Sequence, residues 1–440
     1  MPSILFASHH FLFEQSGGAE VCAQHFLHLL GKRGWRCEAF CGAVRAREDL
    51  PLGKLLAERG LTARTVELQS GPAKFKVHRV DAEGMPGLVY EPETMTRPPA
   101  PREGYPFLQL LDQLLTERRP DVMLTFGGNW LSRAAMMVAR RHGVPVVFWL
   151  RHLRYQHADL FDSCSAMIVP SEFSARFYKE KFGIDCDVVP APIRMDRAFC
   201  PNRRPKCATF VAPNPNKGAF YFARIATELA RLRPDIPMLV AVGRGDLSWL
   251  DKTGLNLRKL PNLKVMPPTP DARNFWSVTR VHLAPALWNE TFMRTGAEAM
   301  FNGIPVLASR RGAIPATLGE SGFLFDIPER YTPEASLVPS AEEVEPWVRT
   351  VIRLWDDEAF YREQSGRSLA ESRRFHPDVV IPAHEKVLER AMRRARKRPD
   401  PLPPLANDLA GLQKWFEKPM QLEKFVPAEP LARHPIFAPR

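Results

Sequence analysis

Several features that mark whole classes of protein are missing from this sequence. Its seven cysteines are scattered and form no C-x-x-C pair, which argues against a disulfide framework and against a zinc site. No apolar run approaches the length needed to span a bilayer. The N-terminal "MPSILFAS" lacks the charged start, apolar stretch and cleavage site of a signal peptide. We therefore expect a cytoplasmic protein that holds no metal.

What the chain does have is length and positive charge. With 440 residues it is too long for one ordinary core, so two domains of similar size plus an appendage are expected. The formal net charge of +12 favours anionic partners, such as a nucleotide, a phospholipid surface or nucleic acid. The sign of the charge alone does not choose among these partners.

The chain alternates between short apolar runs, Gly-rich or polar turns, and helical patterns, and it does so in both halves. This alternation is typical of α/β folds with doubly wound parallel sheets. In the first half we expect a helix from about residue 19 to 30, and strands at 3–8, 121–126, 144–150 and 166–171. In the second half the expected strands are 207–212, 237–243, 263–267, 281–285 and 304–309.

The same patterns suggest where the domains end. We expect a first domain over 1–192, a second over 193–375, a basic helix over 376–398 and a Pro-rich tail over 399–440. Residues 84–105 are rich in proline and polar residues, and we expect them to form a loop inserted in the first domain.

One short helical stretch holds two carboxylates, Glu290 and Glu298, with seven residues between them. Glu290 follows an expected strand, so it lies where open α/β sheets bind ligands. If a helix starts at Thr291 and ends before Gly303, Glu298 lies roughly 12 Å further along it, at about 1.5 Å per residue. An acid at a helix start is often only a favourable charge on the helix dipole. The pair, however, could grip two ends of one polar ligand.

The start of that helix is also a place for a phosphate. The backbone amides of Thr291, Phe292 and Met293 would be free there and would point outward. A diphosphate with a hydroxyl-rich ring on each side would fit both the amides and the two carboxylates.

The stretch resembles a motif of retaining glycosyltransferases of family 4, which have the GT-B architecture of two Rossmann-like domains facing across a cleft. That motif reads E-x-F-G-x4-E-A-x-x-x-G-x-P-V, followed by a Gly-x-x-Pro turn. The matching residues here are Glu290, Phe292, Glu298, Ala299, Gly303, Pro305, Val306, Gly312 and Pro315. The resemblance covers most of residues 1–395. It implies that Glu290 contacts the donor sugar, that Glu298 holds the ribose of its nucleotide, and that the C-terminal helix crosses back to the first domain.

The resemblance assigns further donor-side residues in the second domain. Lys217 takes the place of the lysine that neutralises the departing diphosphate. The family usually carries an arginine shortly before it, where this sequence has Pro213 and Asn214; Asn214 can offer only a hydrogen bond. Arg294 could supply the missing charge. Met293 stands where the family has glycine, so a thioether is expected near the sugar pocket.

In the first domain the resemblance points to turns after strands. Gly17 and Gly18 match a Gly-Gly-Ala-Glu loop that faces the donor diphosphate, although a Gly-Gly turn alone is more often only a turn. His152 matches the histidine near the primary hydroxyl of the donor sugar. Arg151, His10 and Gly128 are acceptor-side candidates.

Two other patterns receive a structural interpretation. Asp185 and Asp187 spell the D-x-D of a different glycosyltransferase fold, but family 4 enzymes generally need no metal, so we expect surface acids. We interpret the basic run 389–398 first as a solvated helix face and second as an attachment to anionic lipid at the inner membrane face. Binding to nucleic acid is the third interpretation, because no nucleic-acid-binding module accompanies the run.

Together these features predict a retaining, metal-independent glycosyltransferase that needs no cofactor. Its donor would be a nucleotide-diphosphate sugar and its acceptor a glycan, a lipid-linked glycan or a small molecule. Two alternatives stay open. One is a GT-B protein that binds a nucleotide sugar without transferring it, and the other is a basic adaptor for membranes or nucleic acid.

Overall fold

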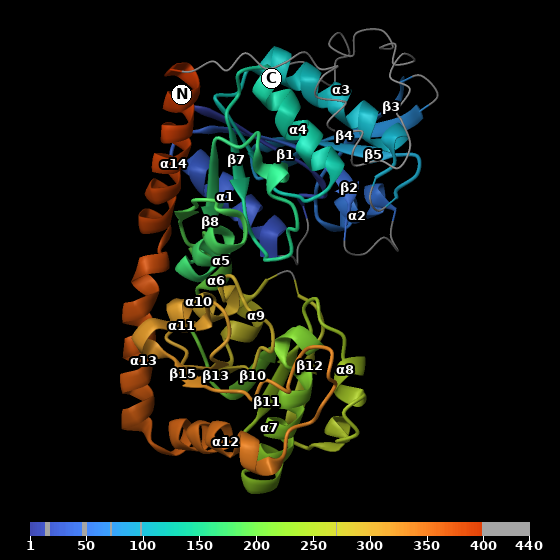
Figure 1. Ribbon diagram of the computed structural model, residues 1–440. Helices are drawn as coiled ribbons and strands as arrows, with labels where there is room; N and C mark the ends of the chain where they lie inside the picture. Colours follow the sequence, from blue (N-terminus) through green and yellow to red (C-terminus); the bar gives the residue numbers. More distant parts are fainter. Residues whose placement is uncertain (14–17, 46–50, 71–72, 97–98, 270, 398–440) are drawn as a thin grey trace.

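The computed structural model describes residues 1–13, 18–45, 51–70, 73–96, 99–269 and 271–397, which fold into two α/β domains stacked end to end (Figure 1). Each domain is built on one sheet. Within the described residues the first sheet has nine strands in the order β3-β4-β5-β2-β1-β6-β7-β8-β9, and the second has six in the order β12-β11-β10-β13-β14-β15. The expected fold class of two doubly wound domains is confirmed.

The strands of the first sheet are β1 Ser3–His10, β2 Arg36–Val44, β3 Arg64–Ser70, β4 Ala73–Ala82, β5 Met85–Pro92, β6 Val122–Thr125, β7 Val146–Trp149, β8 Ala166–Val169 and β9 Asp187–Val188. Those of the second sheet are β10 Cys207–Val211, β11 Met238–Ala241, β12 Leu263–Met266, β13 Thr279–Ala284, β14 Val306–Ser309 and β15 Phe323–Phe325. The α-helices are α1 Gly18–Lys32, α2 Leu52–Glu58, α3 Pro101–Arg118, α4 Trp130–Arg141, α5 Glu172–Phe182, α6 Met195–Ala198, α7 Ala219–Leu232, α8 Ser248–Asp251, α9 Arg273–Trp276, α10 Arg294–Phe301, α11 Ile314–Leu318, α12 Ala341–Asp356, α13 Glu358–Ser372 and α14 Pro377–Lys397.

The first sheet carries an antiparallel arm that the sequence did not predict. Strands β3, β4 and β5 form two antiparallel pairs, and β5 then joins β2 in parallel. The loop expected over 84–105 is therefore wrong, because it contains all of β5 and the first turn of α3. The prolines that suggested a loop are compatible with both elements. Pro101 is the first residue of α3, where no helical hydrogen bond needs its missing N–H.

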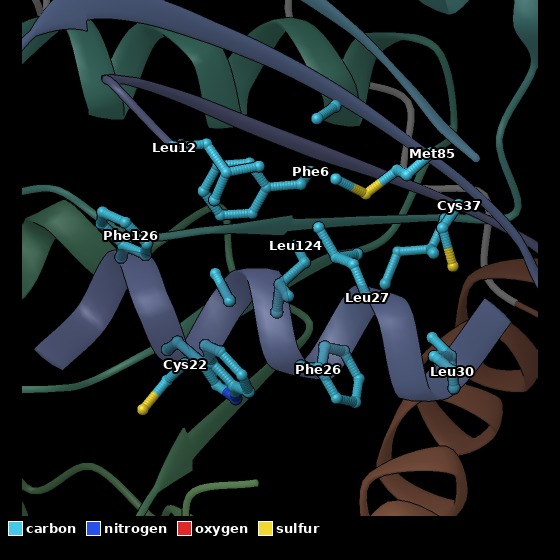
Figure 2. Packing of buried hydrophobic residues seen from close by; sticks show 14 of the residues in the cluster. Phe6, Leu12, Cys22, Phe26, Leu27, Leu30, Cys37, Met85, Leu124 and Phe126 are labelled. Carbon is cyan, nitrogen blue, oxygen red and sulfur yellow. The ribbon is translucent and has the colours of Figure 1, made fainter. Parts of the chain in front are cut away.

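Helix α1 is fixed against the first sheet by apolar side chains spaced four residues apart. Cys22, Phe26 and Leu30 are buried on one face of the helix, where the Phe26 ring lies 5.1 Å from that of Trp149 in β7. Leu27 lies beside Leu124 of β6 (Figure 2). Burial of a side chain as large as Phe26 contributes about 1.5–3 kcal/mol. Because the helix follows β1, this packing holds its N-terminus at the carboxyl ends of the parallel strands.

The chain returns from the second domain to the first through α14, as the resemblance implied; α13 runs along one side of the second domain and α14 continues along the same side of the first (Figure 1). Its His384 is fully buried, with its ring 4.9 Å from that of Phe26. Further along, Arg390 pairs with Asp187 of β9. Asp187, the second acid of the D-x-D sequence, therefore has a structural role. Asp185, the first acid, pairs with Lys179 at 2.8 Å.

The end of α14 contains part of the basic run. Arg393 faces Glu389 on the same helix at 3.5 Å, which is the arrangement of a solvated helix face. The tail 399–440 lies outside the described residues. In the part that is described, no helix has both the length and the apolar composition to span a membrane.

Candidate active site

A cavity of about 1260 Å³ lies between the two domains. Its walls come from α1 and the end of β7 in the first domain, and from the segments after β10 and β13 in the second. Ten of the residues singled out in the sequence line it: Gly18, Arg151, His152, Asn214, Lys217, Glu290, Thr291, Phe292, Arg294 and Glu298. The two predicted carboxylates and the predicted lysine therefore face one space.

Glu290 is held by the backbone around it. Its carbonyl accepts a hydrogen bond from the amide of Ala313 at 2.7 Å. Gly312, with φ of 55°, passes so close that a Cβ there would lie 2.5 Å from the Glu290 carbonyl oxygen. Only glycine fits at this point, because both the space and the left-handed backbone exclude a side chain. The motif glycine therefore keeps Glu290 at the edge of the cavity.

The Glu290 carboxylate forms an ion pair with the ammonium of Lys217. Glu290 is only 6% exposed, so its charge depends on this partner. Lys217 ends a short 3-10 helix, Pro215–Lys217, where the Asn214 side chain accepts a hydrogen bond from the Lys217 amide at 3.0 Å. Asn214 thus positions the lysine by capping this turn.

The helix after Glu290 begins later than predicted. Helix α10 starts at Arg294 rather than at Thr291. The amide of Met293 donates to the Thr317 hydroxyl at 3.3 Å, so it is not free to bind a phosphate. The Thr291 hydroxyl donates to the carbonyl of Arg151 at 2.9 Å, which joins the two domains beside the cavity. These long-range hydrogen bonds keep the segment out of the helix.

Met293 does not reach the cavity. It is 3% exposed and belongs to the core of the second domain, where its sulfur packs against Gly296. With Glu290 and Lys217 it lines a separate void of about 10 Å³, and the expectation that its thioether lies near the sugar pocket stays a prediction. The non-helical backbone before α10 turns this side chain inward.

Glu298 lies in the second turn of α10 and is 4% exposed. Its carboxylate accepts from the Trp276 indole nitrogen at 3.1 Å and pairs with Arg294 Nε at 2.8 Å. Burial lowers the pKa of the Arg294 guanidinium, whereas the charge and hydrogen bond of Glu298 raise it. The net result is a pKa above the ordinary value. Arg294 therefore lines the cavity as a cation, and its charge is compensated by that of Glu298.

His152 follows the end of β7, and its ring stacks on Tyr155 with centroids 4.4 Å apart. Its Nδ1 accepts a hydrogen bond from the Arg154 amide at 3.1 Å. Desolvation and then the charge of Arg154 lower the pKa of His152, so the imidazole is neutral near pH 7. Its Nε2–H is the ring donor that remains for a ligand.

Three predicted residues are placed differently. Gly17 lies outside the described residues. The His10 ring is tilted against that of Phe126 with centroids 6.0 Å apart, and Gly128 is exposed next to the ring of Tyr155; neither residue lines the cavity. Their acceptor role stays a prediction.

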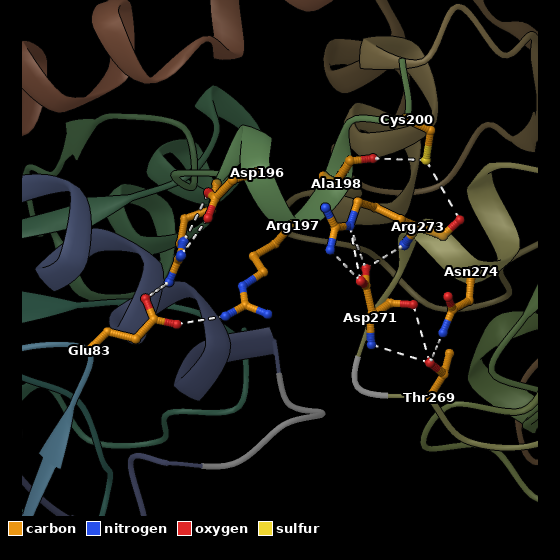
Figure 3. Close-up of polar contacts among 10 residues, drawn as sticks. Glu83, Asp196, Arg197, Ala198, Cys200, Thr269, Asp271, Arg273 and Asn274 are labelled. Atoms are coloured by element: carbon orange, nitrogen blue, oxygen red, sulfur yellow. Dashed lines mark hydrogen bonds and ion pairs between the residues drawn. The ribbon is translucent and has the colours of Figure 1, made fainter. Parts of the chain in front are cut away.

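The sequence reasoning missed a second set of cavity residues. Glu83, at the turn between β4 and β5, pairs with Arg197 at 2.7 Å and also with Arg194 in the connector between the sheets (Figure 3). Arg244, after β11, faces Glu20 of α1 at 3.9 Å across the cavity. Arg244 stands in a "GRGD" turn after an expected strand, and this signal could have revealed it. Glu83 carried no such signal, because β4 and β5 were not expected.

Within the described residues, no group of three or more His, Cys, Asp or Glu side chains is arranged to hold a metal ion. Several charged groups of the cavity are instead paired carboxylates and cations. Such a site can hold hydroxyl groups at its acids and phosphates at its cations.

Comparison with known proteins agrees with this geometry. Residues 205–356 match the family described as "Glycosyl transferases group 1", and residues 17–192 match "Glycosyl transferase 4-like domain". No curated protein matches the sequence at a significant level.

Solved structures resemble the whole fold. Anabaena HepE in complex with UDP and glucose is 16% identical with a TM-score of 0.62, and the match covers 88% of this chain and 100% of that one. The pneumococcal O-GlcNAc transferase GtfA, in complex with UDP and GlcNAc, is 10% identical with a TM-score of 0.63 over 89% and 99% of the chains. The catalytic domain of starch synthase IV from Arabidopsis thaliana, bound to ADP and acarbose, is 13% identical with a TM-score of 0.62 over 89% and 99%. At these identities the likeness establishes the fold.

Proposed function

Because the chain belongs to the glycosyl transferases of group 1 and has the GT-B fold, we propose that it is a retaining glycosyltransferase that uses a nucleotide-diphosphate sugar. One observation carries the proposal. Glu290 and Glu298 follow β13 and Lys217 follows β10, and all three line the same interdomain cavity. A cavity of about 1260 Å³ exceeds the roughly 300–1,000 Å³ typical of a site for one small ligand, so it has room for a donor and an acceptor.

Each of these side chains has a role in holding the donor. Glu298 binds the ribose hydroxyls, because its buried carboxylate has acceptor capacity beyond its bonds to Trp276 and Arg294. Glu290 binds hydroxyls of the donor sugar. Lys217 leaves its pair with Glu290 and neutralises the diphosphate. Two of the similar structures contain UDP, which supports a nucleotide-sugar donor of this kind.

The proposed reaction replaces one bond of the sugar by another on the same face. The bond between the anomeric carbon and the phosphate oxygen breaks, and the acceptor oxygen bonds to that carbon. The proton of the acceptor hydroxyl passes to the departing phosphate oxygen. Lys217 and Arg294 lower the barrier by stabilising negative charge on the diphosphate, and neutral His152 orients the sugar.

The same proposal makes catalysis independent of a metal and of any cofactor. Two cations, Lys217 and Arg294, lie beside the two carboxylates and could carry out the charge neutralisation that a metal would otherwise supply. Transfer rates measured with and without EDTA test this part. A rate that is lost in EDTA and restored by Mg²⁺ or Mn²⁺ would refute it.

The main experiment measures nucleotide release and sugar transfer from UDP-, GDP- and ADP-sugars. We expect the wild type to turn over at least one donor and Glu290→Ala to lower kcat/KM by roughly 10- to 1,000-fold, since it loses contacts made to the reacting sugar. Glu329→Ala, which removes an exposed acid of the same domain, serves as a matched control. Equal turnover by the wild type and Glu290→Ala, or binding without any turnover, would favour a non-catalytic nucleotide-sugar-binding protein.

A further inference from the structure

Arg151 is a cation of the cavity that forms no ion pair with the described residues. Its Nε and Nη2 atoms are buried and have no hydrogen-bond partner in the described part of the chain. The guanidinium carbon lies over the Trp149 ring, 3.8 Å from its centroid. Stacking of this kind attracts a cation but leaves its N–H donors without acceptors.

Five other cations of the cavity differ from Arg151, because each of them faces a carboxylate. These pairs are Lys217 with Glu290, Arg294 with Glu298, Arg194 with Glu83 and Asp196, Arg197 with Glu83, and Arg244 with Glu20. A buried charge without a counter-ion is unfavourable unless a ligand supplies one. Arg151 is therefore suited to receive an anion from outside the protein.

The surroundings of Arg151 also favour the binding of an anion. Burial lowers the pKa of its guanidinium from the ordinary value, and the nearby cation Arg294 acts in the same direction. Because an arginine stays protonated under physiological conditions, the group still carries its charge. An oxyanion bound at Arg151 would compensate the charge of this guanidinium and offset its repulsion by Arg294.

Arg151 is also placed next to the point of sugar transfer. It follows β7 in the first domain, and its carbonyl accepts the hydrogen bond from Thr291, the neighbour of Glu290. The donor diphosphate is assigned to Lys217 on the opposite, second-domain wall of the cavity. An anion at Arg151 therefore belongs to the molecule that enters from the first-domain side.

We infer that Arg151 binds a phosphate or carboxylate carried by the acceptor, and that the protein glycosylates an anionic acceptor. The inference rests on the proposed function and narrows its acceptor class. A guanidinium binds either oxyanion through two parallel N–H bonds, whereas an uncharged acceptor would leave these donors empty. Hydrogen bonds of this charged kind correspond to roughly 10- to 150-fold in affinity.

The first test measures binding of inorganic phosphate by the full-length protein. The nucleoside diphosphate that gives the largest thermal shift, chosen from UDP, GDP and ADP, is first added to saturation so that the donor site is filled. We expect added phosphate to raise the melting temperature further in the wild type and in Arg154→Gln, an exposed arginine of the same segment. This extra shift should be lost in Arg151→Gln and partly kept in Arg151→Lys.

Each contrary outcome has a distinct meaning. If phosphate gives no extra shift in the nucleotide-bound wild type, or the same shift in Arg151→Gln, the inference is wrong. A phosphate shift that disappears when nucleotide is bound assigns Arg151 to the donor diphosphate and also overturns it. If no nucleoside diphosphate or nucleotide sugar binds at all, the proposed function itself fails.

The second test compares acceptors in matched pairs: glucose 6-phosphate with glucose, glucuronic acid with its methyl ester, and farnesyl phosphate with farnesol. We expect kcat/KM to favour the charged member of at least one pair by roughly tenfold or more. Arg151→Gln should reduce that ratio to near one, while Arg154→Gln should preserve it. Preference for the uncharged members, or a ratio that survives in Arg151→Gln, would contradict an anionic acceptor.

Discussion

The assignment of Glu298 to the ribose can be tested by changing the enzyme and the ligand together. In Glu298→Gln the side chain keeps its size but loses the negative charge that ribose hydroxyls would meet. Hydrogen bonds to charged groups contribute about 1.5–3 kcal/mol. At about 1.4 kcal/mol per tenfold, the Kd of the nucleoside diphosphate should rise roughly 10- to 150-fold.

The substitution also has a cost in the free protein, and the assay must allow for it. Glu298 accepts from Trp276 and pairs with Arg294, and an amide cannot accept from both donors without turning its own N–H towards one of them. We expect a loss of about 2 kcal/mol in the free energy of unfolding. For domains of this size that corresponds to roughly 4–8 °C in melting temperature. Binding is therefore measured by calorimetry at 20 °C, where the variant remains folded.

Ribose contacts are isolated by comparing UDP, GDP or ADP with its 2′-deoxy and 3′-deoxy analogues. The wild type should bind at least one deoxy analogue roughly tenfold or more weakly than the parent, whereas Glu298→Gln should bind them alike. Lys217→Ala serves as the control, since it should weaken all three ligands by a similar factor. The reasoning is refuted if the wild type does not discriminate, or if Glu298→Gln discriminates as well as the wild type.

Three further predictions follow from pairs and buried groups. The first is a double-mutant cycle with Lys217→Met and Glu290→Gln, followed by thermal unfolding. The coupling energy between the two side chains should be about 1–3 kcal/mol, less than for a fully buried pair because the Lys217 side chain is 29% exposed. Additive effects of the two substitutions on stability would show that the pair is not formed. The second concerns His384, whose pKa burial lowers to about 3, so that below pH 6.5 the unfolded state takes up a proton that the folded state does not. About 2 kcal/mol of the free energy of unfolding should therefore be lost between pH 7.5 and 5. In urea titrations, the free energy of unfolding of His384→Gln should depend less steeply on pH than that of the wild type, and an unchanged dependence would contradict this. The third concerns α14: Asp187→Asn should weaken its contact with β9 through Arg390 and lower the melting temperature by roughly 1–4 °C. Asp185→Asn removes a far more exposed ion pair and should change the melting temperature by less than about 1 °C. Equal effects of the two substitutions would show that α14 does not depend on the Asp187 contact.

Much of the fold was accessible from local patterns. The strands expected at 3–8, 207–212 and 304–309 were found within two residues of their observed ends, because buried parallel strands appear as short β-branched and apolar runs. The antiparallel arm was missed because β5 is bounded by prolines and its pairing depends on β4, whose contact with it cannot be read from local composition.

The site was predictable in its members and not in its detail. The spacing of Glu290 and Glu298 pointed to one ligand site, the family resemblance added Lys217, and all three residues line one cavity. The start of α10 was not predictable, because the hydrogen bond from the Met293 amide to Thr317 joins residues that are far apart in the sequence. Arg151 was singled out as an acceptor-side candidate, but the burial of its Nε and Nη2 atoms without a hydrogen-bond partner among the described residues could not be read from the sequence.

The most direct test of the account is the melting temperature of the full-length protein with a panel of UDP-, GDP- and ADP-sugars, measured for the wild type and for Glu298→Ala. A ligand at 100 times its Kd stabilises the folded state by about 2.7 kcal/mol, which corresponds to roughly 5–11 °C for domains of this size. We predict such a rise for at least one nucleotide sugar in the wild type and a much smaller one in Glu298→Ala. No rise with any member of the panel, or an equal rise in the variant, would contradict a nucleotide sugar bound between the two domains.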